Sequence, residues 1–187
     1  MSASSARFLD QELIVRRISI VQGEHAVVAE PDVVISTVLG SCIAVCIQDS
    51  VARIGGMNHF LLGEPGENQQ VSAQDLQRYG LHAMELLINA MMRMGAVRAR
   101  LKAHLYGGAN IIAGLGPIGT SNAEFARRFL QTEGIPVGHV DVGGTHARRV
   151  EFMAYAGKAR STAVKDAPPL LIPIVPAAAL GGELELF

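Results

Sequence analysis

Alternating apolar and polar positions predict short β-strands in the first third of the chain. The segment RRISIVQ, beginning at Arg16, alternates and is rich in β-branched side chains, and the pattern continues to Val28 after an interruption at Gly23-Glu24. Pro31-Asp32 is a turn signal, and a further strand is expected from Val33 to Thr37. This part of the chain is therefore expected to form sheet.

A continuous apolar run follows, which is typical of a strand buried on both faces. Gly40-Ser41 predicts a sharp turn into a buried strand from Ile43 to Gln48. Asp49-Ser50 then predicts a reversal into a returning strand over Arg53–Leu62. Inside that strand, Gly55-Gly56 predicts a bulge or a close approach of another part of the chain.

Helical spacing replaces alternation in two later segments. Ser72 and Asp75 suit the first turn of a helix, and Gly95 suits its end. The apolar side chains between them recur at the helical period: Leu76, Tyr79, Ala83, Leu86, Leu87, Ala90, Met91 and Met94. Ser121 and Glu124 form a capping box for a second helix that runs to about Glu133.

The remaining strands complete the predicted fold class. They are Arg98–Tyr106, Pro136–Val142, Arg149–Tyr155 and Ala159–Val164, the last two as a hairpin. Many strands with two main helices predict an α/β chain with α+β layering, in which a mixed sheet is covered by the two helices. We expect one domain over residues 1–166, with residues 1–12 as a loose leader, a mobile polar loop over residues 63–70, and a proline-rich extension over residues 167–187.

Composition and charge exclude several classes of function. The 187 residues have a formal net charge of −1, which gives no electrostatic case for nucleic acid or an anionic membrane. The longest uncharged stretches, residues 103–123 and 167–182, are broken by glycine, asparagine or proline, so no transmembrane insertion is expected. Cys42 and Cys46 would lie about 13 Å apart along a strand, beyond disulfide reach. A cytoplasmic protein with reduced thiols is therefore expected.

Cys42 and His59 are candidates for a nucleophile and its base. Cys42 directly follows the predicted turn at Gly40-Ser41, whereas Cys46 lies within the apolar run, where a buried structural thiol is the commoner outcome. An antiparallel return through Asp49-Ser50 would bring His59 back near the start of the cysteine strand. A thiol and an imidazole in contact share a proton, which makes the sulfur reactive.

A third group could hold the imidazole. Ser36 and Thr37 both lie at the end of the preceding strand, so either hydroxyl could reach the same strand ends, although local hydrogen bonding would explain them equally well. Zinc is not expected, because two cysteines and one histidine at this spacing lack a four-ligand pattern.

A dinucleotide fingerprint is the competing motif. Gly114, Gly116 and Gly119 spell G-x-G-x-x-G before the second predicted helix, and Asp141 follows on the next strand. Only a short apolar run precedes Gly114, and Pro117 stiffens the turn that a phosphate would approach. The remaining chain is also short for a doubly wound domain with a substrate site.

Two blocks of the sequence, LGSCIAVCIQD from Leu39 and GGMNHFLL from Gly55, stand in a characteristic order and spacing. They resemble the CheD family, the chemoreceptor glutamine deamidases of chemotaxis, and carry most of that resemblance. It continues through RYGLHAMELLINAMMRMGA, the IG-x-x-N element at Ile118–Asn122 and DVGGTHARRVEF from Asp141, and so covers roughly residues 16–165. Ala147 stands where the family form is expected to have glycine.

The resemblance implies a Cys-His amidohydrolase that converts receptor glutamine to glutamate, with a fold similar to the cytotoxic necrotizing factor deamidases. It implies that Cys42 is the nucleophile, that His59 is the base, and that the third member is a threonine, carried over to Thr37 or Ser36. Ser41 and Asn58 complete the predicted oxyanion and substrate-binding set. Neither metal nor organic cofactor is implied.

The partners implied are the cytoplasmic helices of chemoreceptors and a CheC-type phosphatase. The alternative is a non-catalytic adaptor that binds chemoreceptors or such a phosphatase.

Overall fold

The computed structural model describes residues 15–62, 73–111 and 117–164. The predicted leader, the loop over residues 63–70, the helix cap at Ser72 and the C-terminal extension lie outside the described residues. No helix in the described part of the chain combines the length and the apolar character needed to span a bilayer.

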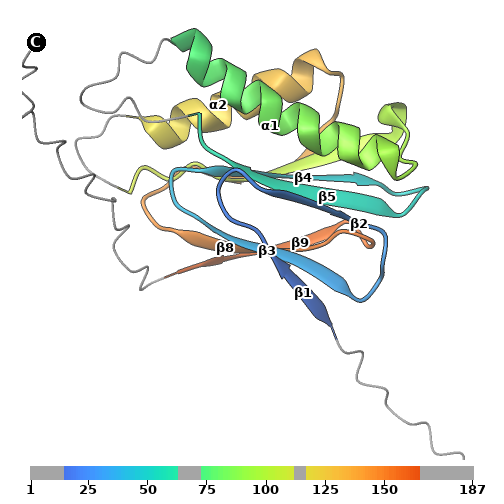
Figure 1. Ribbon diagram of the computed structural model, residues 1–187. Coiled ribbons are helices and arrows are strands. Elements are labelled where there is room, and N and C mark those ends of the chain that lie inside the picture. The colour runs from blue at the N-terminus through green and yellow to red at the C-terminus, as the bar shows by residue number, and fades with distance from the viewer. Residues whose placement is uncertain (1–14, 63–72, 112–116, 165–187) are drawn as a thin grey trace, which may run out of the picture.

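The described residues form three layers: two helices, a five-stranded sheet and a four-stranded sheet (Figure 1). The five-stranded sheet has the order β2-β5-β4-β6-β7, with bounds His25–Val28, Ile54–Phe60, Ile43–Asp49, Leu101–Gly107 and Val137–Val142. The four-stranded sheet has the order β1-β3-β8-β9, with bounds Arg16–Ser19, Val33–Leu39, Arg148–Met153 and Lys158–Ala163. Both sheets are mixed, because β1 pairs parallel with β3 and β6 pairs parallel with β7.

The α+β layering is confirmed, but the prediction of one sheet is wrong. All seven residues of β5 are buried, because the helices cover one face of its sheet and the second sheet covers the other. The predicted close approach at Gly55-Gly56 is present. A Cβ on Gly55 would lie 2.6 Å from the carbonyl oxygen of Ala154, which directly follows β8 of the second sheet, and one on Gly56 would lie 2.7 Å from Leu87 of a helix. The β4–β5 register is continuous, so the pair marks close packing rather than a bulge.

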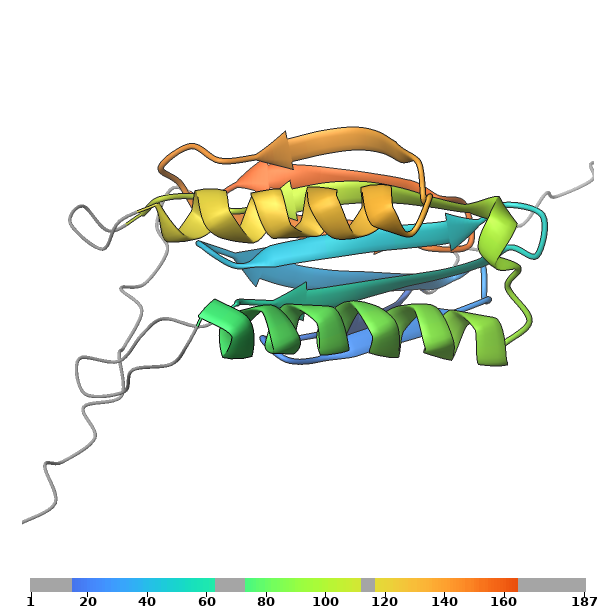
Figure 2. The same ribbon diagram turned by 90° about the horizontal axis from the view of Figure 1, so that it is seen from above.

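Helices α1 (Ala73–Arg93) and α2 (Ile118–Thr132) run side by side across the five-stranded sheet (Figure 2). Their existence is confirmed, but details differ from the prediction. The side chains of α1 that are packed against the sheet include Met84, Leu87, Ile88 and Met91, whereas Tyr79 and Met94 of the predicted stripe are exposed.

The predicted capping box of the second helix is wrong. Helix α2 begins at Ile118, so Ser121 lies inside it, and its N–H donates to the Pro117 carbonyl over 2.9 Å. Proline is compatible with this helix start because it supplies a fixed φ and needs no N–H partner.

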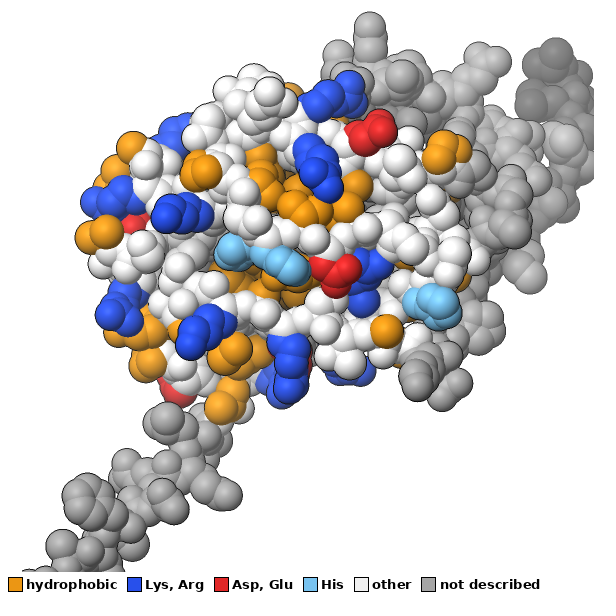
Figure 3. Space-filling view, turned by 180° about the vertical axis from the view of Figure 1, so that it is seen from behind, with side chains coloured by type: hydrophobic (Ala, Val, Ile, Leu, Met, Phe, Trp, Pro, Cys, Tyr) orange, Lys and Arg blue, Asp and Glu red, His pale blue; other side chains and the backbone are white. Residues whose placement is uncertain are grey.

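Charged side chains are dispersed over the face of the molecule seen in Figure 3. Figure 3 shows a face on which Lys and Arg side chains stand apart from one another among uncharged and apolar groups.

Asp49 anchors the end of β4. Its buried carboxylate accepts hydrogen bonds from the N–H groups of Val51, Ala52 and Val97 and a bidentate pair from the Arg100 guanidinium. Arg100 belongs to the 3-10 helix η1 (Arg98–Arg100). This helix stands where the strand was predicted to begin, so β6 starts at Leu101 instead. These donors hold the pKa of Asp49 well below its usual range, led by the Arg100 hydrogen bonds.

Replacing Asp49 with asparagine should destabilise the fold by about 3 kcal/mol at neutral pH, because a buried charged pair loses one partner. Arg100 is partly exposed, which keeps the loss at the low end for such pairs. Because the pKa of Asp49 is lowered in the folded state, the stability advantage of the wild type is fully present above about pH 4, the ordinary carboxyl value, and shrinks as the pH falls below it. Urea unfolding of both proteins across this range tests it. If the difference in unfolding free energy between the two proteins did not depend on pH, the buried Asp49 carboxylate would not be the source of the stability.

Candidate active site

The turn that carries Cys42 connects the two sheets. It leaves β3 of the four-stranded sheet and enters β4 of the five-stranded sheet. The chain after β6 supports it, because Gly108 N–H donates to the Cys42 carbonyl over 2.8 Å and Ala109 N–H donates to the Gly40 carbonyl over 2.9 Å. A side chain at Gly107 would collide with the Cys42 carbonyl, so this close support requires glycine.

His59 lies on the face of β5 that is turned toward the second sheet. In the β4–β5 register it pairs with Ala44, and Ala44 is buried in the core between the sheets. Cys42 lies two residues before Ala44 and packs against the same core. Cys42 precedes the first paired residue of β4 and so stands diagonal to His59 at the end of the β4–β5 ladder, a relation across which an imidazole can reach. The antiparallel return predicted through Asp49-Ser50 is confirmed.

Thr37 holds the imidazole from the opposite sheet. Its hydroxyl lies 2.8 Å from His59 Nδ1 and 2.8 Å from the Ile20 carbonyl oxygen, to which it donates. A hydroxyl has one proton, so toward the ring it can only accept, and Nδ1 must carry the hydrogen. The lone pair of neutral His59 is therefore on Nε2.

The environment of His59 keeps the ring neutral. Burial lowers the pKa of His59 to about 4, and the Ile20 carbonyl and the Glu24 carboxylate oppose this only in part. Among the described residues, Nε2 of His59 is the buried side-chain nitrogen or oxygen that lacks a hydrogen-bond partner. At neutral pH the Nε2 lone pair is therefore available to accept a proton, although a pKa this low makes the ring a weaker base than an ordinary histidine.

The side chain of Ser36 lies on the opposite face of β3 from that of Thr37. Its hydroxyl lies 3.2 Å from that of Ser19 on β1, and neighbouring residues of a strand alternate between faces. The structure therefore brings Thr37, and not Ser36, to His59.

For the glutamine conversion that the family resemblance implies, replacing Thr37 with valine should lower turnover by roughly 10- to 100-fold, since the ring loses the group that fixes its tautomer. Thr37→Ser keeps the hydroxyl and should remain within about threefold of wild type. Ser36→Ala is the matched control and should have little effect. Steady-state ammonia release measures all three variants. A loss in Ser36→Ala equal to that in Thr37→Val would contradict this placement.

The segment between β1 and β2 completes the surroundings of the site, and sequence reasoning missed it. Gly23 N–H donates to the His59 carbonyl over 2.8 Å, and His59 N–H donates to the Glu24 carbonyl over 3.0 Å. The Cys42 sulfur lies 3.5 Å from Oε1 of Gln22. The local sequence signal for this segment was the interruption at Gly23-Glu24, which predicts a turn but not that the turn packs beside His59.

Asn122 ties together the strand ends that carry Cys42 and His59. Its buried side chain donates to the Ser41 carbonyl over 2.8 Å and accepts from Leu62 N–H over 3.0 Å. The contact of Ser41 with Asn122 is therefore made by its backbone carbonyl. The signal that could have found Asn122 is an amide on the apolar side of a predicted helix, within the IG-x-x-N element.

Asn58 is not brought to Cys42. It pairs with Val45, on the face of β5 turned toward the helices. There its side chain accepts from Val45 N–H over 3.0 Å and donates to the Ala83 carbonyl over 3.2 Å. The amide is already used in joining β4, β5 and α1.

Cys46 is a core residue. It is fully buried between the sheets, and burial raises the pKa of its thiol far above the ordinary value. No group of three or more His, Cys, Asp or Glu side chains in the described residues could hold a metal ion.

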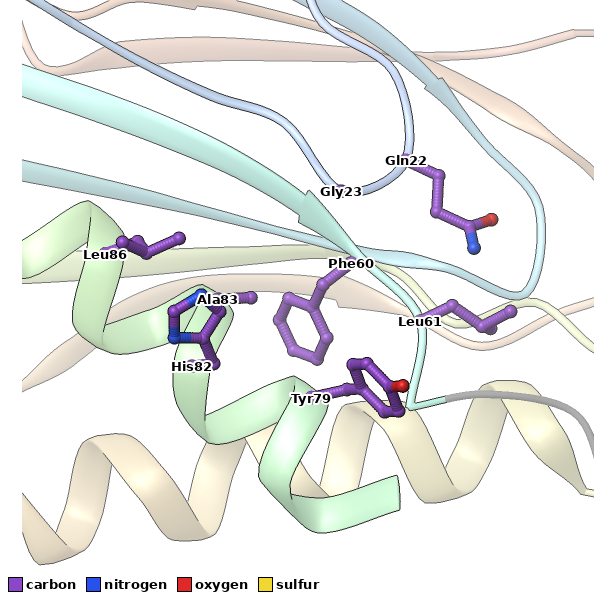
Figure 4. A pocket seen from close by; sticks show the side chains of 8 residues that line it. All are labelled: Gln22, Gly23, Phe60, Leu61, Tyr79, His82, Ala83 and Leu86. Atoms are coloured by element: carbon purple, nitrogen blue, oxygen red, sulfur yellow. The ribbon is translucent and has the colours of Figure 1, made fainter. Parts of the chain in front are cut away.

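A hollow of about 360 Å³ lies beside the site, between the β1–β2 turn, the end of β5 and α1 (Figure 4). Phe60, Tyr79 and His82 gather on one side of it, and Gln22 descends from the turn on the other. Gln22 therefore borders both the hollow and the cysteine sulfur.

The structure also bears on the dinucleotide alternative. Strand β6 ends at Gly107, well before Gly114, although β6, α2 and β7 do form a unit with parallel strands. Gly114 and Gly116 lie outside the described residues. Gly119 serves close packing, since a Cβ there would lie 2.6 Å from the Ala109 carbonyl oxygen. Asp141 forms an ion pair with Arg148 at 2.6 Å.

A neutral buried histidine held by a hydroxyl, beside a thiol on a turn, defines a candidate cysteine–histidine site. Comparison with known proteins then gives the family. Residues 61–163 match the model of the family described as CheD chemotactic sensory transduction. The chain belongs to the CheD family.

Curated relatives agree with this assignment. The chain is 56% identical over 155 residues to the "Probable chemoreceptor glutamine deamidase CheD" of Zymomonas mobilis, which covers 83% of this chain and 84% of the relative. It is 47% identical over 177 residues to the protein of the same name from Caulobacter vibrioides, covering 91% and 93%.

Likenesses to solved structures are weak. The Bacillus licheniformis hypothetical protein YfiH matches with a TM-score of 0.43 and 14% identity, over 72% of this chain and 62% of that one. A Neisseria meningitidis protein, NMB0706, matches with a TM-score of 0.37 and 18% identity, over 66% and 53%. Similarity at this level carries no argument about fold or function.

Proposed function

We propose that this chain is a protein-glutamine deamidase that converts glutamine side chains of chemoreceptors to glutamate. The observation that carries the proposal is the Thr37–His59 hydrogen bond, which leaves the free lone pair of the ring on Nε2 beside the turn that bears Cys42. The names of the relatives support the substrate class.

The proposed reaction has two halves. His59 Nε2 takes the proton of the Cys42 thiol, the sulfur attacks the carboxamide carbon, and a tetrahedral oxyanion forms. His59 returns the proton to the leaving nitrogen, so ammonia departs and a thioester remains. A water molecule, activated by His59, then cleaves the thioester to glutamate and restores the thiol. The reaction consumes one water and releases one ammonia, and no step calls for a metal or an organic cofactor.

Backbone groups at the turn are the first candidates to stabilise the oxyanion. The N–H groups of Ser41 and Cys42 belong to a segment whose carbonyls are already fixed by Asn122 and Gly108. Fixed donors act without reorganisation during the reaction. Asn58 has no part in the proposed site because its amide bonds within the helix-facing core.

The partners proposed are the cytoplasmic helices of chemoreceptors, which places the protein in the cytoplasm, and a CheC-type phosphatase as regulator. The likeness of the fold to the cytotoxic necrotizing factor deamidases stays a prediction.

Co-expression with a chemoreceptor tests the proposal. Peptide mass spectrometry should find the mass gain of amide-to-acid conversion at receptor glutamines only when the chain is present. The adaptor alternative predicts receptor binding without a mass gain. The adaptor alternative also predicts that iodoacetamide labels Cys42 slowly at neutral pH. The deamidase proposal predicts that Cys42 is labelled much faster than Cys46. Bound but unmodified receptor would overturn the deamidase proposal.

A further inference from the structure

Gln22 stands where a reacting carbonyl oxygen would need a donor. Its Oε1 lies 3.5 Å from the Cys42 sulfur, the atom that would form the new bond to the substrate. The developing oxyanion is attached to the carbon bonded to that sulfur, so it must lie within a few ångströms of the same carboxamide. The side chain also lines the hollow between the β1–β2 turn, the end of β5 and α1 (Figure 4).

The backbone that carries Gln22 is fixed relative to the base. The adjacent Gly23 donates to the His59 carbonyl, and Glu24 accepts from the His59 N–H. The turn is closed by Glu24 N–H on the Val21 carbonyl at 3.0 Å and by Val21 N–H on the Glu24 carboxylate at 2.9 Å. Gly23 has φ of +89°, a conformation that favours glycine. Gln22 and His59 therefore keep their spacing as a unit.

The chemistry of a carboxamide suits both stages of the reaction. In the resting enzyme, Gln22 Oε1 accepts from the thiol, as observed. Once the thiol proton has passed to His59, the sulfur can no longer donate, and the developing oxyanion needs donors. Rotation about the last side-chain bond exchanges the oxygen for Nε2, which has two N–H donors. Amide donors aimed at an oxyanion are an established means of catalysis.

We propose that Gln22 is a catalytic residue whose side-chain amide donates to the oxyanion formed on Cys42, in company with the backbone N–H groups of the turn. The inference rests on the proposed deamidase function. It assigns to the β1–β2 turn a direct part in the reaction, in addition to holding His59.

Two substitutions of Gln22 test whether its side chain acts as a hydrogen-bond donor. Gln22→Met keeps the length of the side chain without donors, and should lower kcat for ammonia release from a receptor fragment roughly 10²-fold with KM within about threefold. Gln22→Glu keeps the shape but presents a carboxylate, which only accepts, and should lose more than Gln22→Met at neutral pH. As the pH falls toward about 4.5, the carboxyl gains a proton and can donate, so the deficit of Gln22→Glu relative to wild type should shrink.

Controls keep the outcomes distinct. Gln131 is an exposed glutamine near the end of α2, and Gln131→Met and Gln131→Glu should behave as wild type. Gln22 is exposed, so its variants should unfold at the wild-type temperature. An unchanged or increased kcat in Gln22→Met would overturn the inference, the increase meaning that Gln22 obstructs the site. A mass gain on the Gln22 peptide that requires Cys42 would also overturn it, because the carboxamide would then be substrate.

Failure of the inference differs from failure of the proposed function. If wild type releases ammonia and Cys42→Ala does not, while Gln22→Met equals wild type, only the donor role fails. If wild type releases none, the deamidase proposal itself fails.

Discussion

Replacing Cys42 with alanine is expected to abolish glutamine conversion, with a loss of at least ~10³-fold, because no other described group can replace the sulfur that forms the thioester. The site around it should survive. The turn at Cys42 is held through its carbonyl and its neighbours, by Gly108 and Asn122, and none of these bonds involves the sulfur. The variant should therefore keep its fold and its binding to receptor while losing the mass gain on receptor peptides.

Cys46→Ala is the matched control for that experiment. Cys46 is fully buried between the sheets, so its loss should cost about 1 kcal/mol in stability and leave turnover near wild type. If Cys42→Ala keeps wild-type conversion, the thioester mechanism is wrong whatever the family. If only Cys46→Ala is inactive and still folded, the two thiols have been assigned the wrong way round.

Local signals predicted the strands and turns that carry these residues. Gly40-Ser41 lies between β3 and β4 as expected, and Asp49 ends β4 where the reversal was predicted. Asp49 does so because a short carboxylate can accept from the two N–H groups that follow it in the turn. Such features depend on residues adjacent in sequence, which is why a pattern along the chain is sufficient to find them.

The second sheet could not be predicted by the same means. A run that is apolar at every position, such as Ile43 to Ile47, shows only that both faces are covered and not what covers them. Here α1 and α2 cover one face and β3, β8 and β9 the other (Figure 1). The start of α2 was misplaced for a related reason, since a capping pattern at Ser121 was outweighed by packing of Gly119 against the chain after β6.

Alternation along the strand separates the two candidates for the third member but does not choose between them. Thr37 shares a face with Ile35 and Leu39, and Ser36 shares the other face with Val38, so both faces are apolar in the sequence. Only the structure shows that the face of Ile35 and Leu39 is the one packed between the sheets, whereas Val38 is 45% exposed. Gln22 was different, because its contact with Cys42 joins segments distant in the sequence and no local pattern encodes it. For Asn122 the local pattern marks a buried amide, but not that its partner is the Ser41 carbonyl.

His59→Asn should lower conversion by about 10³-fold, because the asparagine amide can occupy the position of Nδ1–H and still donate to Thr37, while the lone pair of Nε2 is lost. In the wild type, burial lowers the pKa of His59 to about 4, so the base stays neutral at mildly acid pH. The acid limb of kcat/KM should accordingly fall near pH 4 and not near 6.5, the ordinary value for histidine. A limb near 6.5 would mean that His59 is exposed to solvent in the working enzyme.

The same substitution separates the ring's chemistry from its effect on folding. With a pKa of about 4 when folded and 6.5 when unfolded, His59 binds its proton more readily in the unfolded chain between these values. Wild-type stability should thus fall as the pH drops from 6.5 to 4, by about 2 kcal/mol, while His59→Asn should lack this component. Urea unfolding at pH 4.5 and 7 measures the difference. Equal pH dependence in both proteins would show that His59 is not the buried neutral group on which the proposed base role depends.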